Sequence, residues 1–104
     1  MATCARPLVL RLLGDTALSC NGTSRALPKS RKTRALLAYL AIEARPVRRE
    51  ALCELLWESA ADPRAALRWS LSKLRPLLET PRGQALRADA HSVELDPALV
   101  IVDA

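Results

Sequence analysis

The strongest periodic pattern of hydrophobic and polar positions lies in residues 62–78. Leucines recur there at spacings of four, three and four residues, at Leu67, Leu71, Leu74 and Leu78. At about 100° per residue these positions form one narrow stripe on a helix. Asp62 followed by Pro63 is typical of a helix N-cap and a first helical residue. The pattern therefore predicts an amphipathic helix that bends or weakens near Arg75, because of Pro76, and continues to Glu79.

The face opposite the leucines is basic, small and aromatic. It carries Ala65, Trp69, Ser72, Lys73 and Pro76, and Arg64, Arg68 and Arg75 flank it on one side. A helix of this kind can dock on a core and present its cations to the major groove of DNA. An ordinary surface helix with solvated arginines would show the same pattern. A rotated helix would instead bury Trp69 in the core.

Two shorter helices are predicted before this one. Ser30 is placed to cap a helix over 31–44, whose buried face would be Leu36, Leu37, Leu40 and Ala41. A second helix over 48–57 would bury Leu52, Leu55, Leu56 and Trp57. The short link at 59–61 leads into the leucine-striped helix, so the last two helices match a helix-turn-helix arrangement with a slightly long turn.

Short apolar runs on either side of the helices predict strands. Residues 8–13 and 17–20 end at the turn signals Gly14-Asp15 and Asn21-Gly22, which favours antiparallel pairing, and 25–27 can add a third strand. Residues 85–88 and 92–95 predict a hairpin with Leu86, Val93 and Leu95 as its apolar contacts, and 100–102 predict one more strand. The order of elements predicts an α+β fold.

Composition narrows the class of protein. A length of 104 residues fits a single domain over 1–104, with 1–7 expected to be a flexible N-terminus. Hydrophobic residues make up 50% of the chain, which is enough for a packed core. The net charge of +5 favours an anionic partner, nucleic acid or a membrane surface. Because the cations are spread over several predicted elements, a membrane-surface module is the weaker alternative.

Motifs of catalysis and metal binding do not occur in the sequence. There is no Gly-rich phosphate loop, no H-x-x-E-H and no G-x-S-x-G, so we expect neither an enzyme nor a cofactor. The cysteines Cys4, Cys20 and Cys53 are odd in number and lack C-x-x-C spacing, and His91 is the only histidine. We therefore expect no metal site, no disulfide framework and core-filling thiols in a reducing cytoplasm. Neither a signal peptide nor a membrane-spanning run is seen.

Basic residues outside the leucine-striped helix are further candidate DNA contacts. They are Arg31, Lys32 and Arg34 at the start of the first helix, Arg48 and Arg49 at the start of the second, and Arg87 and His91 in the predicted hairpin, with Arg82 beside it. Cations at helix starts can contact phosphates, which also bind the free backbone N–H groups there. An arginine in a hairpin can read minor-groove width. Solvated patches and loops are the alternative for both groups.

Several stretches carry a family resemblance. Residues 35–41 (ALLAYLA) resemble the first-helix signature of SARP-type transcriptional activators, which have an OmpR/PhoB-like DNA-binding domain. Residues 49–52 and 55–57 resemble the second helix of that family, and 67–68 with 71–75 resemble its recognition helix. Residues 12–14 resemble its opening strand. The order and spacing of these stretches extend the resemblance over residues 8–102.

The resemblance implies a winged helix-turn-helix with a four-stranded N-terminal antiparallel sheet, a three-helix core and a C-terminal hairpin wing. It implies sequence-specific binding of double-stranded DNA in transcriptional regulation, with the third helix in the major groove and the wing near the minor groove. It also implies promoter direct repeats, head-to-tail pairs on DNA and RNA polymerase as a second partner. Members of the family usually continue into a helical activation domain, so the chain resembles an isolated DNA-binding domain, either natural as such or a fragment of a longer regulator.

Three residues depart from the family pattern. Pro76, Trp69 and Arg48 stand where another residue type is expected, which leaves the exact docking and the base preference open. The alternative function is a winged-helix protein-interaction module that does not bind DNA and uses Trp69 as an exposed anchor.

Overall fold

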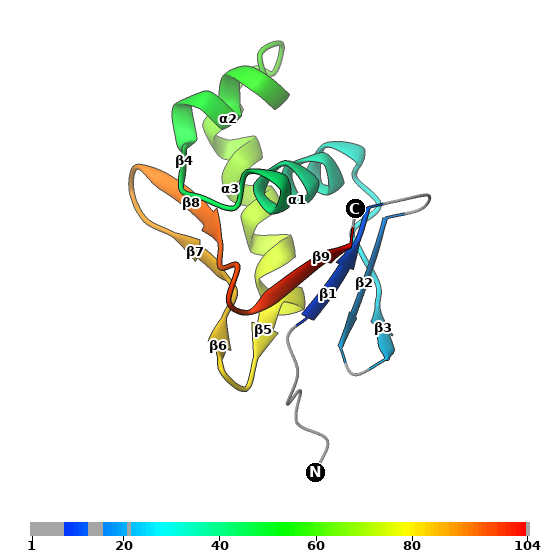
Figure 1. Cartoon of the computed structure of the whole chain (residues 1–104). Coiled ribbons are helices and arrows are strands. Elements are labelled where there is room, and N and C mark those ends of the chain that lie inside the picture. Colours follow the sequence, from blue (N-terminus) through cyan, green and yellow to red (C-terminus); the bar gives the residue numbers. More distant parts are fainter. Residues whose placement is uncertain (1–7, 13–15, 21, 104) are drawn as a thin grey trace.

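The computed structural model describes residues 8–12, 16–20 and 22–103. Three helices, α1 (Arg31–Glu43), α2 (Arg49–Leu56) and α3 (Pro63–Leu74), combine with short strands into the α+β fold that the sequence predicts. Figure 1 shows α3 between a four-stranded sheet on one side and the β7–β8 hairpin on the other. The expected flexible terminus at 1–7 and the turn signals at Gly14, Asp15 and Asn21 lie outside the described residues.

The α3 helix begins as predicted. The Oδ1 atom of Asp62 accepts a hydrogen bond from the Ala65 N–H at 3.1 Å, and Pro63 occupies the first turn. All four leucines of the stripe are buried, with Leu71 the most exposed at 3%. The predicted continuation to Glu79 is wrong, because the α-helix changes at Arg75 into a 3₁₀-helix, η1 (Arg75–Leu78). Pro76 has no N–H for the Ser72 carbonyl, so the α-helical ladder cannot pass it.

The first two helices follow their predicted patterns with one error. Ser30 Oγ accepts from the Thr33 N–H at 3.2 Å, and α1 ends where Ala44 takes a left-handed conformation (φ 52°). In α2, Leu52 and Trp57 are buried as predicted, but Leu55 is 55% exposed. The helix has only eight residues and packs the side that carries Leu52 and Leu56. Around the helix Leu55 lies about 60° from Leu52 and about 100° from Leu56, on the outer edge of that side.

The four-stranded sheet has the order β3 (Thr23–Arg25), β2 (Ala17–Cys20), β1 (Leu8–Arg11), β9 (Val100–Asp103). Strands β1, β2 and β3 pair antiparallel, as predicted, whereas β9 pairs parallel with β1. The fourth strand therefore comes from the C-terminal end, not from the N-terminal region. The third strand covers 23–25 and not the predicted 25–27. The side chain of its last residue, Arg25, donates to the carbonyls of Leu77 and Glu79.

The predicted hairpin is present as β7 (Leu86–Ala88) and β8 (Ser92–Leu95), with Leu86 opposite Leu95. Its three predicted apolar contacts are buried. A two-residue strand, β4 (Val47–Arg48), adds to the other side of β8. A second small hairpin, β5 (Glu79–Thr80) with β6 (Gly83–Gln84), was not expected, and Arg82 lies in its turn. Arg82 thus belongs to a different hairpin from Arg87.

The cysteines differ from each other in their bonding. Cys20 is disulfide-bonded, so the expectation that the cysteines are only reduced core fillers is wrong for it. The cysteine argument for a reducing compartment therefore no longer applies. Cys53 is a free thiol.

No helix in the described part of the chain has the length and apolar character needed to span a membrane.

Candidate nucleic-acid interface

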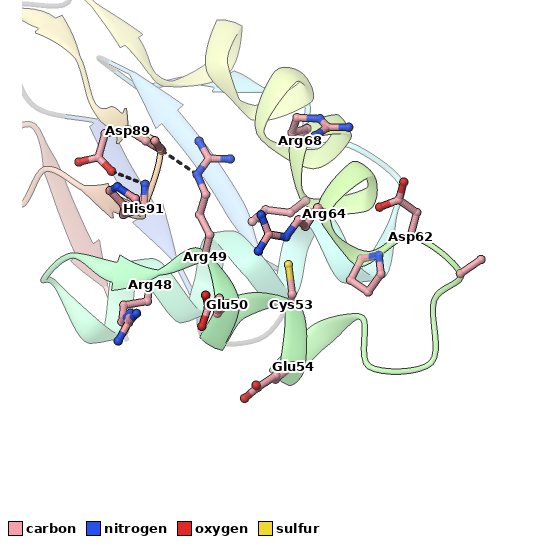
Figure 2. A pocket seen from close by; sticks show the side chains of 14 residues that line it. Arg48, Arg49, Glu50, Cys53, Glu54, Asp62, Arg64, Arg68, Asp89 and His91 are labelled. Carbon is pink, nitrogen blue, oxygen red and sulfur yellow. Dashed lines mark hydrogen bonds between the residues drawn. The ribbon is translucent and has the colours of Figure 1, made fainter.

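A groove lies where the start of α2, the N-terminal half of α3 and the β7–β8 turn meet. Its lining includes five of the predicted DNA contacts: Arg48, Arg49, Arg64, Arg68 and His91. Figure 2 shows these side chains, with Arg48 at the end of β4, Arg49, Arg64 and Arg68 on the two helices and His91 in the hairpin turn. The fold thus gathers four arginines and a histidine from three segments that are well separated along the chain.

Arg49 connects α2 to the hairpin. Its Nε donates a hydrogen bond to the Asp89 carbonyl oxygen at 2.7 Å, which Figure 2 marks. Its backbone N–H donates to the His91 carbonyl oxygen at 2.8 Å. These two bonds hold the hairpin turn against the start of α2. Arg49 therefore has a structural role in the groove beyond the phosphate contact that the sequence suggested.

Asp89 shapes the turn of this hairpin. Its Oδ1 accepts from the backbone N–H groups of His91 at 2.7 Å and Ser92 at 2.8 Å. The bond from the His91 N–H has the largest effect and that from the Ser92 N–H the next. Both stabilise the carboxylate and hold the pKa of Asp89 below its ordinary value. The position of His91 at the groove rim thus depends on an ionised Asp89.

We expect the Asp89 carboxyl to titrate below the ordinary aspartate pKa. A folded-state pKa below the unfolded one means that the contribution of the turn to stability is complete above the unfolded pKa. It is lost as the pH falls through the folded pKa. The measurement follows the carboxyl carbon shift of Asp89 by NMR from neutral to acid pH. In the control Asp89→Asn, the amide signals of His91 and Ser92 should no longer titrate. A midpoint at or above the ordinary value would contradict it.

Acidic side chains also line the groove, which the sequence analysis did not anticipate. They are Glu50, Glu54, Asp62 and Asp89. The carboxylates of Asp62 and Asp89 already accept backbone N–H bonds, at the α3 cap and in the hairpin turn. In Figure 2, Glu54 points away from the labelled arginines. The groove lining thus carries four arginines and four carboxylates, so its cations do not stand alone.

The outward face of α3 is partly organised in the free protein. Trp69 is 51% exposed, which excludes the rotated helix with a buried ring. The Lys73 Nζ lies 5.4 Å from the centroid of the Trp69 ring, within cation–π range. Ser72 Oγ donates to the Trp69 carbonyl at 2.6 Å, so in this arrangement Ser72 offers only an acceptor to a base.

The remaining predicted contacts do not line this groove. Arg31, Lys32 and Arg34 are exposed at the start of α1, and the Arg34 Nε donates to the Pro28 carbonyl at 2.7 Å. Arg75 is exposed in η1. Arg87 pairs with Asp96 at 2.7 Å while 65% of its side chain stays exposed. These residues form separate basic positions around the interface.

Two structurally important interactions were missed by sequence reasoning. Arg25 Nη1 donates to the carbonyls of Leu77 and Glu79, both at 2.9 Å, and so joins β3 to the end of η1. Thr33 Oγ1 and Ser70 Oγ form a buried hydrogen bond of 2.9 Å between α1 and α3. The partners are 37 to 54 residues apart, and no local pattern marks them.

Comparisons with known proteins add one similar structure. No protein-family model and no curated protein sequence matches the chain. The chain is similar to Mycobacterium tuberculosis EmbR, whose structure was solved in complex with a low-affinity phosphopeptide. The TM-score is 0.73 and the sequence identity 28%, over 91% of this chain. The match covers 27% of the EmbR chain, so this chain spans about a quarter of that protein.

Proposed function

We propose that this chain is a sequence-specific, double-stranded-DNA-binding domain of a transcriptional regulator, built as a winged helix. The observation that carries the proposal is the convergence of Arg48, Arg49, Arg64, Arg68 and His91 on one groove. The similarity to EmbR over 91% of this chain and the resemblance to SARP-type activators support it. In this proposal α3 enters the major groove and the β7–β8 hairpin acts as the wing.

Each part of the interface would have its own task. The cations at the start of α2 and in the hairpin would bind phosphates and set the orientation of the domain. Arg68 and Lys73 can donate to guanine O6 and N7, and Trp69 can pack on a thymine methyl group. Because Lys73 already lies beside the Trp69 ring, this pair would meet the base edges as one preformed unit.

Further features of the family are part of the same proposal. We propose that the domain acts without catalysis or a cofactor in the cytoplasm, and that two copies bind promoter direct repeats head to tail. RNA polymerase would be a protein partner of the whole regulator. The competing function is a protein-interaction module that does not bind DNA. The exposure of Trp69 and Leu55 favours it, since an exposed tryptophan can anchor a protein partner.

Salt dependence of duplex binding separates the two functions. We expect the affinity for a labelled random-sequence duplex, measured by anisotropy between 50 and 200 mM salt, to fall linearly on a double-logarithmic plot, by about 0.9 per phosphate contact. The four groove arginines correspond to a slope of up to about 3.6. Selection from a randomised duplex library should then enrich a defined sequence. Absence of duplex binding, or binding without enrichment, would refute the sequence-specific function.

A further inference from the structure

Two polar side chains are fully enclosed in the core of the described chain. Thr33 of α1 is 0% exposed and Ser70 of α3 is 2% exposed. Their hydroxyl oxygens lie 2.9 Å apart, and either can donate. Ser70 directly follows Trp69 on α3, so the pair lies beneath the face that would read DNA. Hydrophobic side chains make up the rest of the described core.

The leucine stripe strongly determines which face of α3 is buried. It determines the register of α3 against α1 only weakly. A slide of α3 by one turn, about 5.4 Å, would bring Leu67, Leu71 and Leu74 to the places of Leu71, Leu74 and Leu78, or the reverse. Apolar contacts are not directional, and after either slide three of the four places would again hold a leucine, while the place of Leu67 or Leu78 would lose one. The stripe therefore favours the correct face but discriminates weakly between neighbouring registers.

The hydroxyl pair does discriminate between registers. A slide of one turn would place Ala66 or Leu67, or else Lys73 or Leu74, opposite Thr33, and none of these carries a hydroxyl. The hydroxyl groups of Thr33 and Ser70 would then be buried without a hydrogen bond to each other. Burying them unpaired destabilises the fold by more than their hydrogen bond stabilises it. Buried polar residues fix register in other helix assemblies for the same reason.

We propose that the Thr33–Ser70 hydrogen bond sets the register of α3 against α1 and so acts as a specificity determinant of DNA reading. Both are positioning residues, since they touch no base. In the observed register Arg64 and Arg68 line the groove beside the hairpin. Trp69 directly follows Arg68 on the helix, and Lys73 lies about one turn beyond Trp69. A slide would move all four relative to the phosphate-binding cations of α2. The inference rests on the proposed function.

The test uses the double variant Thr33→Val with Ser70→Ala. Removing both hydroxyls leaves no polar group unpaired, so the midpoint of its urea transition should stay close to that of the wild type. Its discrimination between the duplex enriched by the wild-type protein and a scrambled duplex of equal composition should fall at least about fivefold, the lower bound for loss of one good base contact. Thr33→Ser keeps the hydroxyl and should retain both properties.

A second readout needs no DNA. The indole N–H of Trp69, assigned with Trp69→Phe, should give one NMR signal in the wild type and in Thr33→Ser. In the double variant it should split or broaden, because α3 then samples more than one register. This measurement tests the register even if the wild-type protein enriches no DNA sequence, a result that would refute the proposed function alone.

The proposal requires both effects in the double variant. A single, unshifted Trp69 signal would overturn the register assignment. Discrimination equal to that of the wild type would overturn the link to DNA reading. Failure of the double variant to fold would also overturn the proposal, because the pair would then be a determinant of stability and not of register.

Discussion

Leu71→Ala is expected to lower the free energy of unfolding by roughly 2–5 kcal/mol. Leu71 lies in the middle of the α3 stripe and is 3% exposed. Truncation removes buried methyl groups and leaves a cavity between α3 and the rest of the core, which can relax only in part. Urea unfolding followed by circular dichroism measures the loss. A reduction of this size is a large fraction of the stability of a small domain.

Leu55→Ala is the matched control for this prediction. It deletes the same atoms from a helix of the same domain, but from a side chain that is 55% exposed. Its unfolding free energy should therefore change by less than about 0.5 kcal/mol. Similar losses of unfolding free energy in the two variants would show that Leu55 is covered in solution. The assignment of the buried face of α2 would then be wrong.

The double variant Arg64→Ala with Arg68→Ala is expected to lower duplex affinity by roughly two orders of magnitude at 50 mM salt. Both residues line the groove from the N-terminal half of α3. If each neutralises one phosphate or base-edge charge, the salt slope should fall by about 1.8 and the electrostatic part of binding should fall with it. Both side chains are exposed, so the urea midpoint should change little.

A charge-matched variant controls for net charge. Arg11→Ala with Arg82→Ala also removes two positive charges, but these exposed residues lie on β1 and in the β5–β6 turn, outside the groove. In Figure 1 the β5–β6 hairpin is at the opposite end of the molecule from α2. We expect this variant to keep the wild-type slope to within about half a unit, since charges beyond a Debye length are screened. Equal effects of the two double variants would indicate attraction by overall charge without a defined groove.

The helices and their ends were determined by local sequence. Ser30 and Asp62 cap α1 and α3 through side-chain bonds to N–H groups three residues ahead, and these geometries depend only on near neighbours. The leucine spacing that buries one face of α3 is equally local. Strand β2 and the β7–β8 hairpin were predicted for the same reason, because alternation and turn residues act over a few positions. The conversion of α3 into η1 at Arg75 was anticipated only as a bend or weakening near that residue.

Only the tertiary structure decided how distant segments meet. The parallel pairing of β9 with β1, the Arg25 bonds to the end of η1 and the Thr33–Ser70 pair join residues whose proximity has no local signature. The exposure of Leu55 depended on which side of a short helix found a neighbour. The groove likewise needed the whole fold, because its cations come from α2, α3 and the hairpin. The sequence named these residues as candidates. Only long-range packing, which depends on all elements at once, brought four arginines and His91 together and placed the other candidates elsewhere.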